Sequence, residues 1–200
     1  VDAVEAGGML GMSSLLAGLP TSVTGATVNR LCGSGMEAVI QASRAIAAGD
    51  AHLVIAGGVE SMSRAPWVLA KPTVSYPRGH ETLYSTTLGW RMVNQAMPAE
   101  WTIALGEGAE ILTDQFAISR EEQDAFALSS HQLAAAAWDK GLYDDEVVIV
   151  EGTGLLRDEC IRADASMDAL ARLKPVFRPE GTVTAGNSSP LNDGAAAMFL

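Results

Sequence analysis

Apolar residues recur every three to four positions in several stretches of the chain, which is the spacing of one face of an α-helix. One stretch opens with a capping box, in which Ser119 is followed three residues later by Glu122. Lys140 and Gly141 form a stop signal that closes the same stretch. The pattern predicts helices over Val4–Leu19, between Cys32 and Gly49, and over Gly108–Phe116, Arg120–Lys140 and Ser166–Leu173.

Short apolar runs between these helices predict β-strands. They lie at Thr24–Leu31, His52–Gly58, Glu146–Val150 and Gly194–Leu200. The run that follows His52 is continuously apolar, which is typical of a parallel strand covered on both faces. The order helix, strand, helix, strand is that of an α/β fold with right-handed crossovers.

The composition describes a globular protein and excludes several functional classes. The 200 residues are 48% hydrophobic, and their net charge of −11 argues against nucleic-acid binding, which needs a basic surface. No apolar run reaches the roughly 20 residues that span a bilayer. Two cysteines are too few for a disulfide framework and fit no metal motif. We therefore expect a cytoplasmic protein with no nucleic-acid partner, no membrane partner and no metal site.

Cys32 is the first candidate for chemistry, because it lies where the strand predicted at Thr24–Leu31 meets the helix behind it. The first turn of a helix has unpaired N–H groups and a partial positive charge, and both stabilise a thiolate. This effect is worth about 0.3–1 kcal/mol, so a neighbouring base is needed as well. On this pattern alone, Cys32 is equally well explained as a small buried residue.

Four segments resemble the thiolase family, the acyl-CoA acyltransferases that work through an acyl-cysteine. The segment NRLCGSGMEAV at Asn29–Val39 matches the Asn-x-x-Cys-x-Ser-Gly pattern around the nucleophile of that family. GGVESMSRAP, SREEQDAFALSSHQLAAAAWDKG and LARLKPVFRPEGTVTAGNSSPLNDGAAAMFL match further thiolase segments in the family's order. The resemblance covers nearly the whole chain.

The resemblance implies a layered α/β domain with a mixed sheet covered by helices and an inserted α-rich loop domain. Residues 1–58 and 182–200 are expected to form the N-terminal α/β domain, and residues 59–181 the inserted domain that binds coenzyme A. The family's C-terminal half is expected to lie outside these 200 residues. A homodimer or homotetramer is expected for the full-length protein.

The resemblance also assigns roles to three residues. Cys32 is expected to attack the keto carbon of a 3-ketoacyl-CoA, while its backbone N–H stabilises an oxyanion. Arg162 is expected to contact the adenine nucleotide of CoA, and Ser189 its pantetheine arm. CoA is thus a co-substrate, and no bound cofactor is expected. Pro190 departs from the usual family pattern directly after Ser189.

Two catalytic motifs of the family are missing from the sequence: the Gly-His-Pro motif and the Cys-x-Gly-x-Gly motif that supplies a second cysteine. His52, His80 and His131 lie elsewhere and are expected to be surface or structural residues, and Cys160 an inert thiol. The chain begins at Val1. We therefore expect a fragment that does not turn over alone.

Several functions fit the sequence. Acetoacetyl-CoA thiolases usually carry His-Met-Gly where this chain has Ala104-Leu105-Gly106. This difference favours a degradative enzyme, such as one of fatty-acid β-oxidation, over a biosynthetic acetoacetyl-CoA thiolase. A cysteine hydrolase with His80 as its base and a non-catalytic, truncated thiolase-fold domain also stay open.

Overall fold

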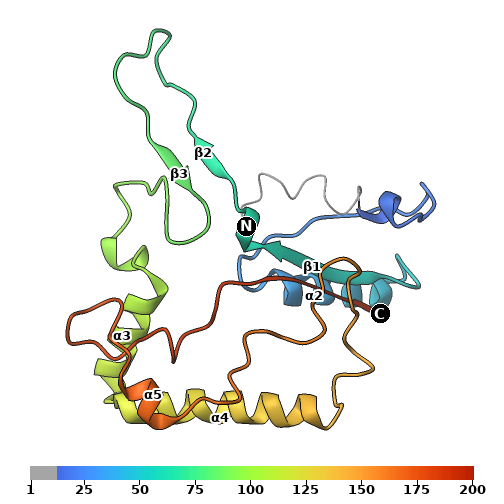
Figure 1. The fold of residues 1–200 in the computed structure, drawn as a ribbon. Helices are drawn as coiled ribbons and strands as arrows, with labels where there is room; N and C mark the ends of the chain where they lie inside the picture. Colours follow the sequence, from blue (N-terminus) through green and yellow to red (C-terminus); the bar gives the residue numbers. More distant parts are fainter. Residues whose placement is uncertain (1–12) are drawn as a thin grey trace. The chain divides into compact units, whose positions relative to one another are not determined.

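The computed structural model describes residues 13–200 and consists of two compact units (Figure 1). Residues 13–91 and the segment Leu191–Leu200 form the first unit, and Met92–Pro190 forms the second. Most of the helix expected over Val4–Leu19 lies outside the described residues, but residues 13–16 are helical.

The first unit is built on a helix packed along a strand pair. Its elements are α2 (Ser34–Ala48), β1 (Ile55–Ser61), the 3-10 turn η1 (Met62–Arg64), β2 (Trp67–Leu69), β3 (Leu83–Ser85) and β4 (Asp193–Phe199). β1 pairs with β4 and β2 pairs with β3. Helix α2 lies beside β1, and small residues, Ala42 of α2 and Ala56 of β1, are buried there (Figure 1). Helix α2 and strands β1 and β4 are confirmed elements of the expected α/β fold.

The pairing of β1 corrects the expectation of a parallel strand covered on both faces. β1 runs antiparallel to β4, with Ile55 opposite Phe199 and Ser61 opposite Asp193. Ile55 and Val59 remain about half exposed. An apolar run indicates that a strand forms, but it carries no information on the direction of the partner, which is set by the chain's path.

The first compact unit extends past Gly58, and the domain boundaries expected at Gly58 and Thr182 stay predictions. Residues 59–91 stay with the first unit because β1 continues to Ser61 and the next turn is tied to β4. There, Ser63 donates from its main-chain N–H (2.9 Å) and from its hydroxyl (2.5 Å) to the carboxylate of Asp193. These bonds from Ser63 lower the pKa of Asp193. The role of residues 59–181 in binding CoA stays a prediction.

We expect that Gly57→Ala destabilises the first unit while Gly58→Ala does not. A methyl group on Gly57 would lie 2.6 Å from the carbonyl oxygen of Ala196 on the paired strand, whereas one on Gly58 meets nothing within 4 Å. Overpacking of this kind costs about 1–3 kcal/mol. Urea titration of the two variants measures the free energy of unfolding. Equal values for both variants would contradict the close pairing of β1 and β4.

The second unit is helical. It contains the 3-10 turn η2 (Ala99–Trp101), α3 (Leu105–Phe116), α4 (Arg120–Asp139) and α5 (Met167–Ala171). The capping box at the start of α4 is confirmed: the Glu122 N–H donates to the Ser119 hydroxyl (3.2 Å), and the Ser119 N–H donates to the Glu122 carboxylate (2.8 Å). Helix α3 begins three residues before the predicted Gly108, and α5 is shorter than predicted.

Two predicted strands are not formed. Residues 23–29 have no regular secondary structure, so the strand expected at Thr24–Leu31 is wrong, and residues 147–150 also lack a strand. Val148 in the second segment is 85% exposed. β-propensity expresses a fit to a half-buried pleated surface, and neither run finds a pairing strand among residues 13–200.

Two large apolar residues of α4 are exposed, and its buried positions are small or polar. Phe126 and Leu133 are 80% and 70% exposed, whereas Asp124 and Ala135 are buried. The helix turns a carboxylate inward because Arg120 and Asn187 bind it. Within residues 13–200, no helix combines the length and the apolar character needed to cross a bilayer.

Candidate functional site

Cys32 lies two residues before the first residue of α2, near the helix start that the sequence predicted, and it is an exposed, free cysteine. Gly33 is the N-cap of the helix and offers no side-chain cap. The Cys32 main-chain N–H has no hydrogen-bond partner within the part of the chain that the structure describes. An exposed thiol beside an unpaired N–H and a helix start fits a nucleophile better than a buried structural cysteine.

The corner that presents Cys32 is a strained turn held by two side chains. Leu31 has a φ of 51°, in the left-handed region that costs a residue with a Cβ about 1–2 kcal/mol. The side-chain amide oxygen of Asn29 accepts a hydrogen bond from the Leu31 N–H (2.8 Å). The Ser34 hydroxyl accepts the Arg30 N–H (2.8 Å) and donates to the Leu31 carbonyl (2.7 Å). These bonds offset the cost of the turn.

The turn gives a physical reason for the polar residues of the Asn-x-x-Cys-x-Ser-Gly pattern. Both Asn29 and Ser34 satisfy main-chain groups of the two residues that precede Cys32. Sequence reasoning named neither as functional. The sequence could have indicated their role, because asparagine and serine side chains often form hydrogen bonds with nearby main-chain groups in turns.

A charge pair lies next to this corner. The Arg30 guanidinium is 3.2 Å from the Glu37 carboxylate, which belongs to the first turn of α2. The positive charge of Arg30 partly offsets the negative charge of Glu37. Glu37 therefore repels a thiolate at the helix start less than an unpaired acid would. The pair is partly open to solvent, so we assign it no large effect.

The two predicted CoA contacts belong to the second unit, while Cys32 belongs to the first. Arg162 is exposed, and its main-chain N–H donates to Nδ1 of His131 on α4 (3.2 Å). His131, predicted to be a surface or structural residue, thus fixes the backbone of the segment that carries Arg162.

Ser189, the other predicted contact, is exposed and follows a segment without regular secondary structure. That segment is anchored to α3 by a buried acid. The Glu110 carboxylate accepts the N–H groups of Thr182 (2.9 Å) and Val183 (2.8 Å) and the Thr182 hydroxyl (3.0 Å). Glu110 is only 1% exposed. Sequence reasoning did not foresee this anchor.

The anchor sets the charge state of Glu110. Burial by itself raises the pKa of a carboxyl group, but the hydrogen bonds from Val183 and Thr182, with the positive charge of Arg178, outweigh burial and lower the pKa of Glu110. Arg178 in turn pairs with Glu107 (2.7 Å) and Asp114 (2.6 Å) on α3. Glu110 is therefore ionised at neutral pH.

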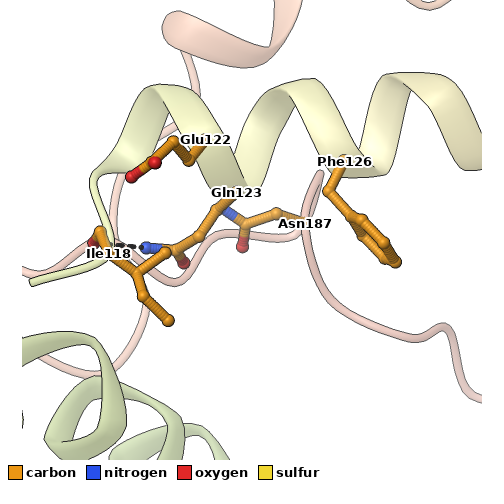
Figure 2. A pocket seen from close by; sticks show the side chains of 5 residues that line it. All are labelled: Ile118, Glu122, Gln123, Phe126 and Asn187. Atoms are coloured by element: carbon orange, nitrogen blue, oxygen red, sulfur yellow. Dashed lines mark hydrogen bonds between the residues drawn. The ribbon is translucent and has the colours of Figure 1, made fainter. Parts of the chain in front are cut away.

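An open hollow of about 340 Å³ lies at the start of α4 (Figure 2). It is lined by Ile118, Glu122, Gln123, Phe126 and Asn187. The Gln123 amide N–H₂ donates to the Ile118 and Ser119 carbonyls, so Gln123 is held in place. The Asn187 side chain reaches from its loop toward this helix (Figure 2). No cluster of three metal-binding side chains occurs among the described residues.

Comparison with protein families matches residues 6–200 to the family described as "Thiolase, N-terminal domain". A beta-ketoadipyl-CoA thiolase of Pseudomonas knackmussii is 50% identical over 196 residues, which are 94% of this chain and 49% of that protein. The 3-oxoadipyl-CoA/3-oxo-5,6-dehydrosuberyl-CoA thiolase of Escherichia coli K12 is 48% identical, with the same coverage. The chain spans about half the length of the curated relatives it matches.

Solved structures of thiolases are also similar to this chain, which again covers about half the length of each. Human mitochondrial 3-ketoacyl-CoA thiolase, crystallised in complex with CoA, superposes with a TM-score of 0.86 at 33% identity. The match covers 98% of this chain and 49% of the human one. The Bacillus anthracis acetyl-CoA acetyltransferase gives a TM-score of 0.79 at 40% identity over 94% of this chain and 48% of its own. The mixed α/β content of the chain is thus that of its thiolase neighbours.

Proposed function

Because the chain belongs to the thiolase family and corresponds to the N-terminal part of its members, we propose that the protein transfers acyl groups between CoA thiols through Cys32. The observation that carries this proposal is the Cys32 corner, where an exposed thiol lies near the start of α2 beside a main-chain N–H that has no partner among residues 13–200. Thiolases use CoA as a substrate, and Arg162 and Ser189 are the proposed contacts for it.

The proposed reaction has two steps. First, the Cys32 thiolate attacks the keto carbon of a 3-ketoacyl-CoA, and the bond between the α and β carbons breaks. The electron pair of that bond, with a proton from an acid, leaves as the methyl group of acetyl-CoA. Second, the thiolate of free CoA attacks the acyl-Cys32 thioester, which releases the shortened acyl-CoA and regenerates the Cys32 thiolate.

Each tetrahedral intermediate places a negative charge on an oxygen next to the Cys32 sulfur. The Cys32 N–H supports this charge, since a fixed donor that has no other partner among residues 13–200 needs no rearrangement during the reaction. The acid and base that move protons are assigned to residues outside these 200, because the chain has neither a Gly-His-Pro nor a Cys-x-Gly-x-Gly motif. Turnover is therefore proposed for the protein in its natural length.

For the substrate, we propose a 3-ketoacyl-CoA whose acyl chain ends in a carboxylate, of the 3-oxoadipyl type. Support comes from the names of the relatives at 48–50% identity, which are thiolases of beta-ketoadipyl-CoA or 3-oxoadipyl-CoA. These names shift the expectation away from fatty-acid β-oxidation. The second candidate, acetoacetyl-CoA, has some support from an acetyl-CoA acetyltransferase of Chromobacterium violaceum at 46% identity.

A panel of three substrates tests this choice: 3-oxoadipyl-CoA, 3-oxohexanoyl-CoA, which has the same chain length without the carboxylate, and acetoacetyl-CoA. A charge-assisted hydrogen bond to the carboxylate is worth about 1.5–3 kcal/mol, so we expect kcat/KM for 3-oxoadipyl-CoA to exceed that for 3-oxohexanoyl-CoA by about 10- to 100-fold. Equal values, or the highest value for acetoacetyl-CoA, would contradict the proposed substrate.

A further inference from the structure

Two buried carboxylates of the second unit bind the same irregular segment from two helices. Glu110 of α3 holds the beginning of the segment at Thr182 and Val183, and Asp124 of α4 holds its end at Asn187. Both acids are 1% exposed. The proposed reaction uses neither of them, which raises the question of what their burial achieves.

Asn187 is the centre of the bonds at the end of the segment. Its amide N–H₂ donates to the Asp124 carboxylate (3.1 Å) and to the Thr182 carbonyl (3.0 Å), and its carbonyl oxygen accepts the Thr184 N–H (2.8 Å). Both donor hydrogens of the side-chain amide and its oxygen therefore have partners. The segment from Thr182 to Asn187 is thereby closed into a loop of fixed shape.

Asp124 is itself fixed by the helices around it. The Arg120 guanidinium donates to its other carboxylate oxygen (2.8 Å) and also to the carbonyls of Leu170, in α5, and Leu173, two residues after α5 ends. A bonded chain therefore runs from α5 through Arg120 and Asp124 to Asn187. Charge-assisted bonds in a buried place are stiff as well as stable, so Asn187 has little freedom to move.

Ser189 comes two residues after this fixed point and one residue before a proline. Proline disfavours the helical region for the residue before it and holds that residue in an extended conformation. The backbone of Ser189 is thus restrained from Asn187 on one side and from Pro190 on the other. Pro190, which departs from the family pattern, thus adds to the restraint that the Asp124–Asn187 hydrogen bond places on the backbone of Ser189.

We propose that Asn187, oriented by Asp124, is a positioning residue that aims Ser189 at the pantetheine arm of CoA. This inference rests on the proposed function, because it takes Ser189 as a CoA contact. It assigns the buried Asp124–Asn187 pair a task in coenzyme binding beyond holding the fold. A misplaced binding group lowers affinity for its ligand even when the group itself is unchanged.

The test compares variants of the protein in its natural length, with a KM for CoA and a kcat measured for each. Asn187→Ala removes the bridge, and we expect it to raise the KM for CoA on the order of tenfold with kcat changed less than about threefold. Asn94→Ala is the matched control, because Asn94 caps an exposed turn by accepting the Ala96 N–H (2.9 Å). It is expected to leave both constants unchanged.

A charge swap keeps the test valid if Asn187→Ala fails to fold. Asn187→Asp places two carboxylates face to face and is expected to raise the KM more than Asn187→Ala does. The double variant Asn187→Asp with Asp124→Asn restores one donor and one acceptor across the contact and is expected to recover part of that increase. Alkylation of Cys32 by iodoacetamide, which needs no CoA site, should proceed at the wild-type rate in every folded variant.

The outcomes separate this inference from the proposed function. If folded Asn187 variants keep the KM for CoA within twofold of the wild type, or if kcat falls while the KM is constant, the positioning role is wrong. If the charge swap recovers nothing, the Asp124 part of the proposal is wrong. A wild-type protein that neither binds CoA nor forms an acyl-enzyme would instead overturn the proposed function itself.

Discussion

Replacement of Cys32 by serine is expected to lower kcat for thiolysis by at least about 10³-fold in the protein of natural length. A serine hydroxyl ionises far less readily than a thiol, and what the described residues supply around Cys32 is a nearby helix start and a main-chain N–H without a partner among them. The measurement is the steady-state rate of 3-oxoadipyl-CoA cleavage with saturating CoA.

Cys160→Ser is the matched control for this prediction. Cys160 lies in the second unit, where its main-chain N–H donates to the Asp158 carboxylate (2.8 Å), a bond that serine keeps. We expect its kcat to stay within about twofold of the wild type. Loss of activity in the Cys160 variant with retention in the Cys32 variant would exchange the roles of the two thiols and refute the account.

Glu110→Ala is expected to cost about 3 kcal/mol of unfolding free energy, the largest effect on stability that we predict. The substitution leaves the N–H groups of Thr182 and Val183 without their acceptor in a buried place, and each orphaned group costs about 1–3 kcal/mol. Since small domains have about 5–15 kcal/mol in total, the second unit would be close to unfolding. Urea titration at neutral pH measures the loss.

Two further variants sharpen this prediction. Glu121→Ala, which replaces an exposed acid in the first turn of α4, is the matched control and is expected to change stability by less than about 0.5 kcal/mol. Glu110→Gln keeps one oxygen for the two N–H groups and should lie between the wild type and Glu110→Ala. A Glu110→Ala protein as stable as the Glu121 control would show that the anchor contributes nothing.

The same acid predicts a pH dependence. Because the pKa of Glu110 is lowered in the folded protein relative to its ordinary value of 4.5, its contribution to stability is present above that value and is lost as the pH falls through the folded pKa. The free energy of unfolding of the wild type should therefore exceed that of Glu110→Gln at neutral pH, and the difference should disappear as the pH falls below about 4.5. If the difference in unfolding free energy between the two proteins grew toward low pH, the ionised Glu110 carboxylate would not be the stabilising form, and the anchor would be contradicted.

The parts of the fold that depend on neighbouring residues were predictable from the sequence. The capping box fixed the start of α4 at Arg120, and the apolar spacing placed α2 directly behind Cys32. Both features depend on residues within a few positions of one another, where periodicity and capping are informative. The position of Cys32 at a helix start was predictable for the same reason.

The parts that depend on distant residues were not predictable. Glu110 is buried because it meets N–H groups 72 and 73 positions later in the chain, and Asp124 because Asn187 lies 63 positions away. A polar residue on a helix reads as exposed until such a partner is known. The direction of β4 and the unpaired segments at 23–29 and 147–150 have the same cause, since a strand requires its partner.

The candidate site was predictable in identity but not in geometry. The thiolase resemblance singled out Cys32, Arg162 and Ser189, and these residues stay predictions of function. It did not reveal that Asn29 and Ser34 hold the turn before Cys32. A single sequence shows that a polar residue is present, but not whether it bonds the nearby main chain or contacts a substrate. The positive φ of Leu31 shows that this turn is strained and that hydrogen bonds are needed to hold it.

Peptide mapping by mass spectrometry tests the central claim most directly. The protein of natural length is incubated with 3-oxoadipyl-CoA in the absence of free CoA, digested at low pH, and searched for an acyl adduct. The account predicts the adduct on the peptide that contains Cys32, and its disappearance when CoA is added before digestion. An adduct on another side chain, or a Cys32 peptide that stays unmodified while acetyl-CoA is released, would contradict it.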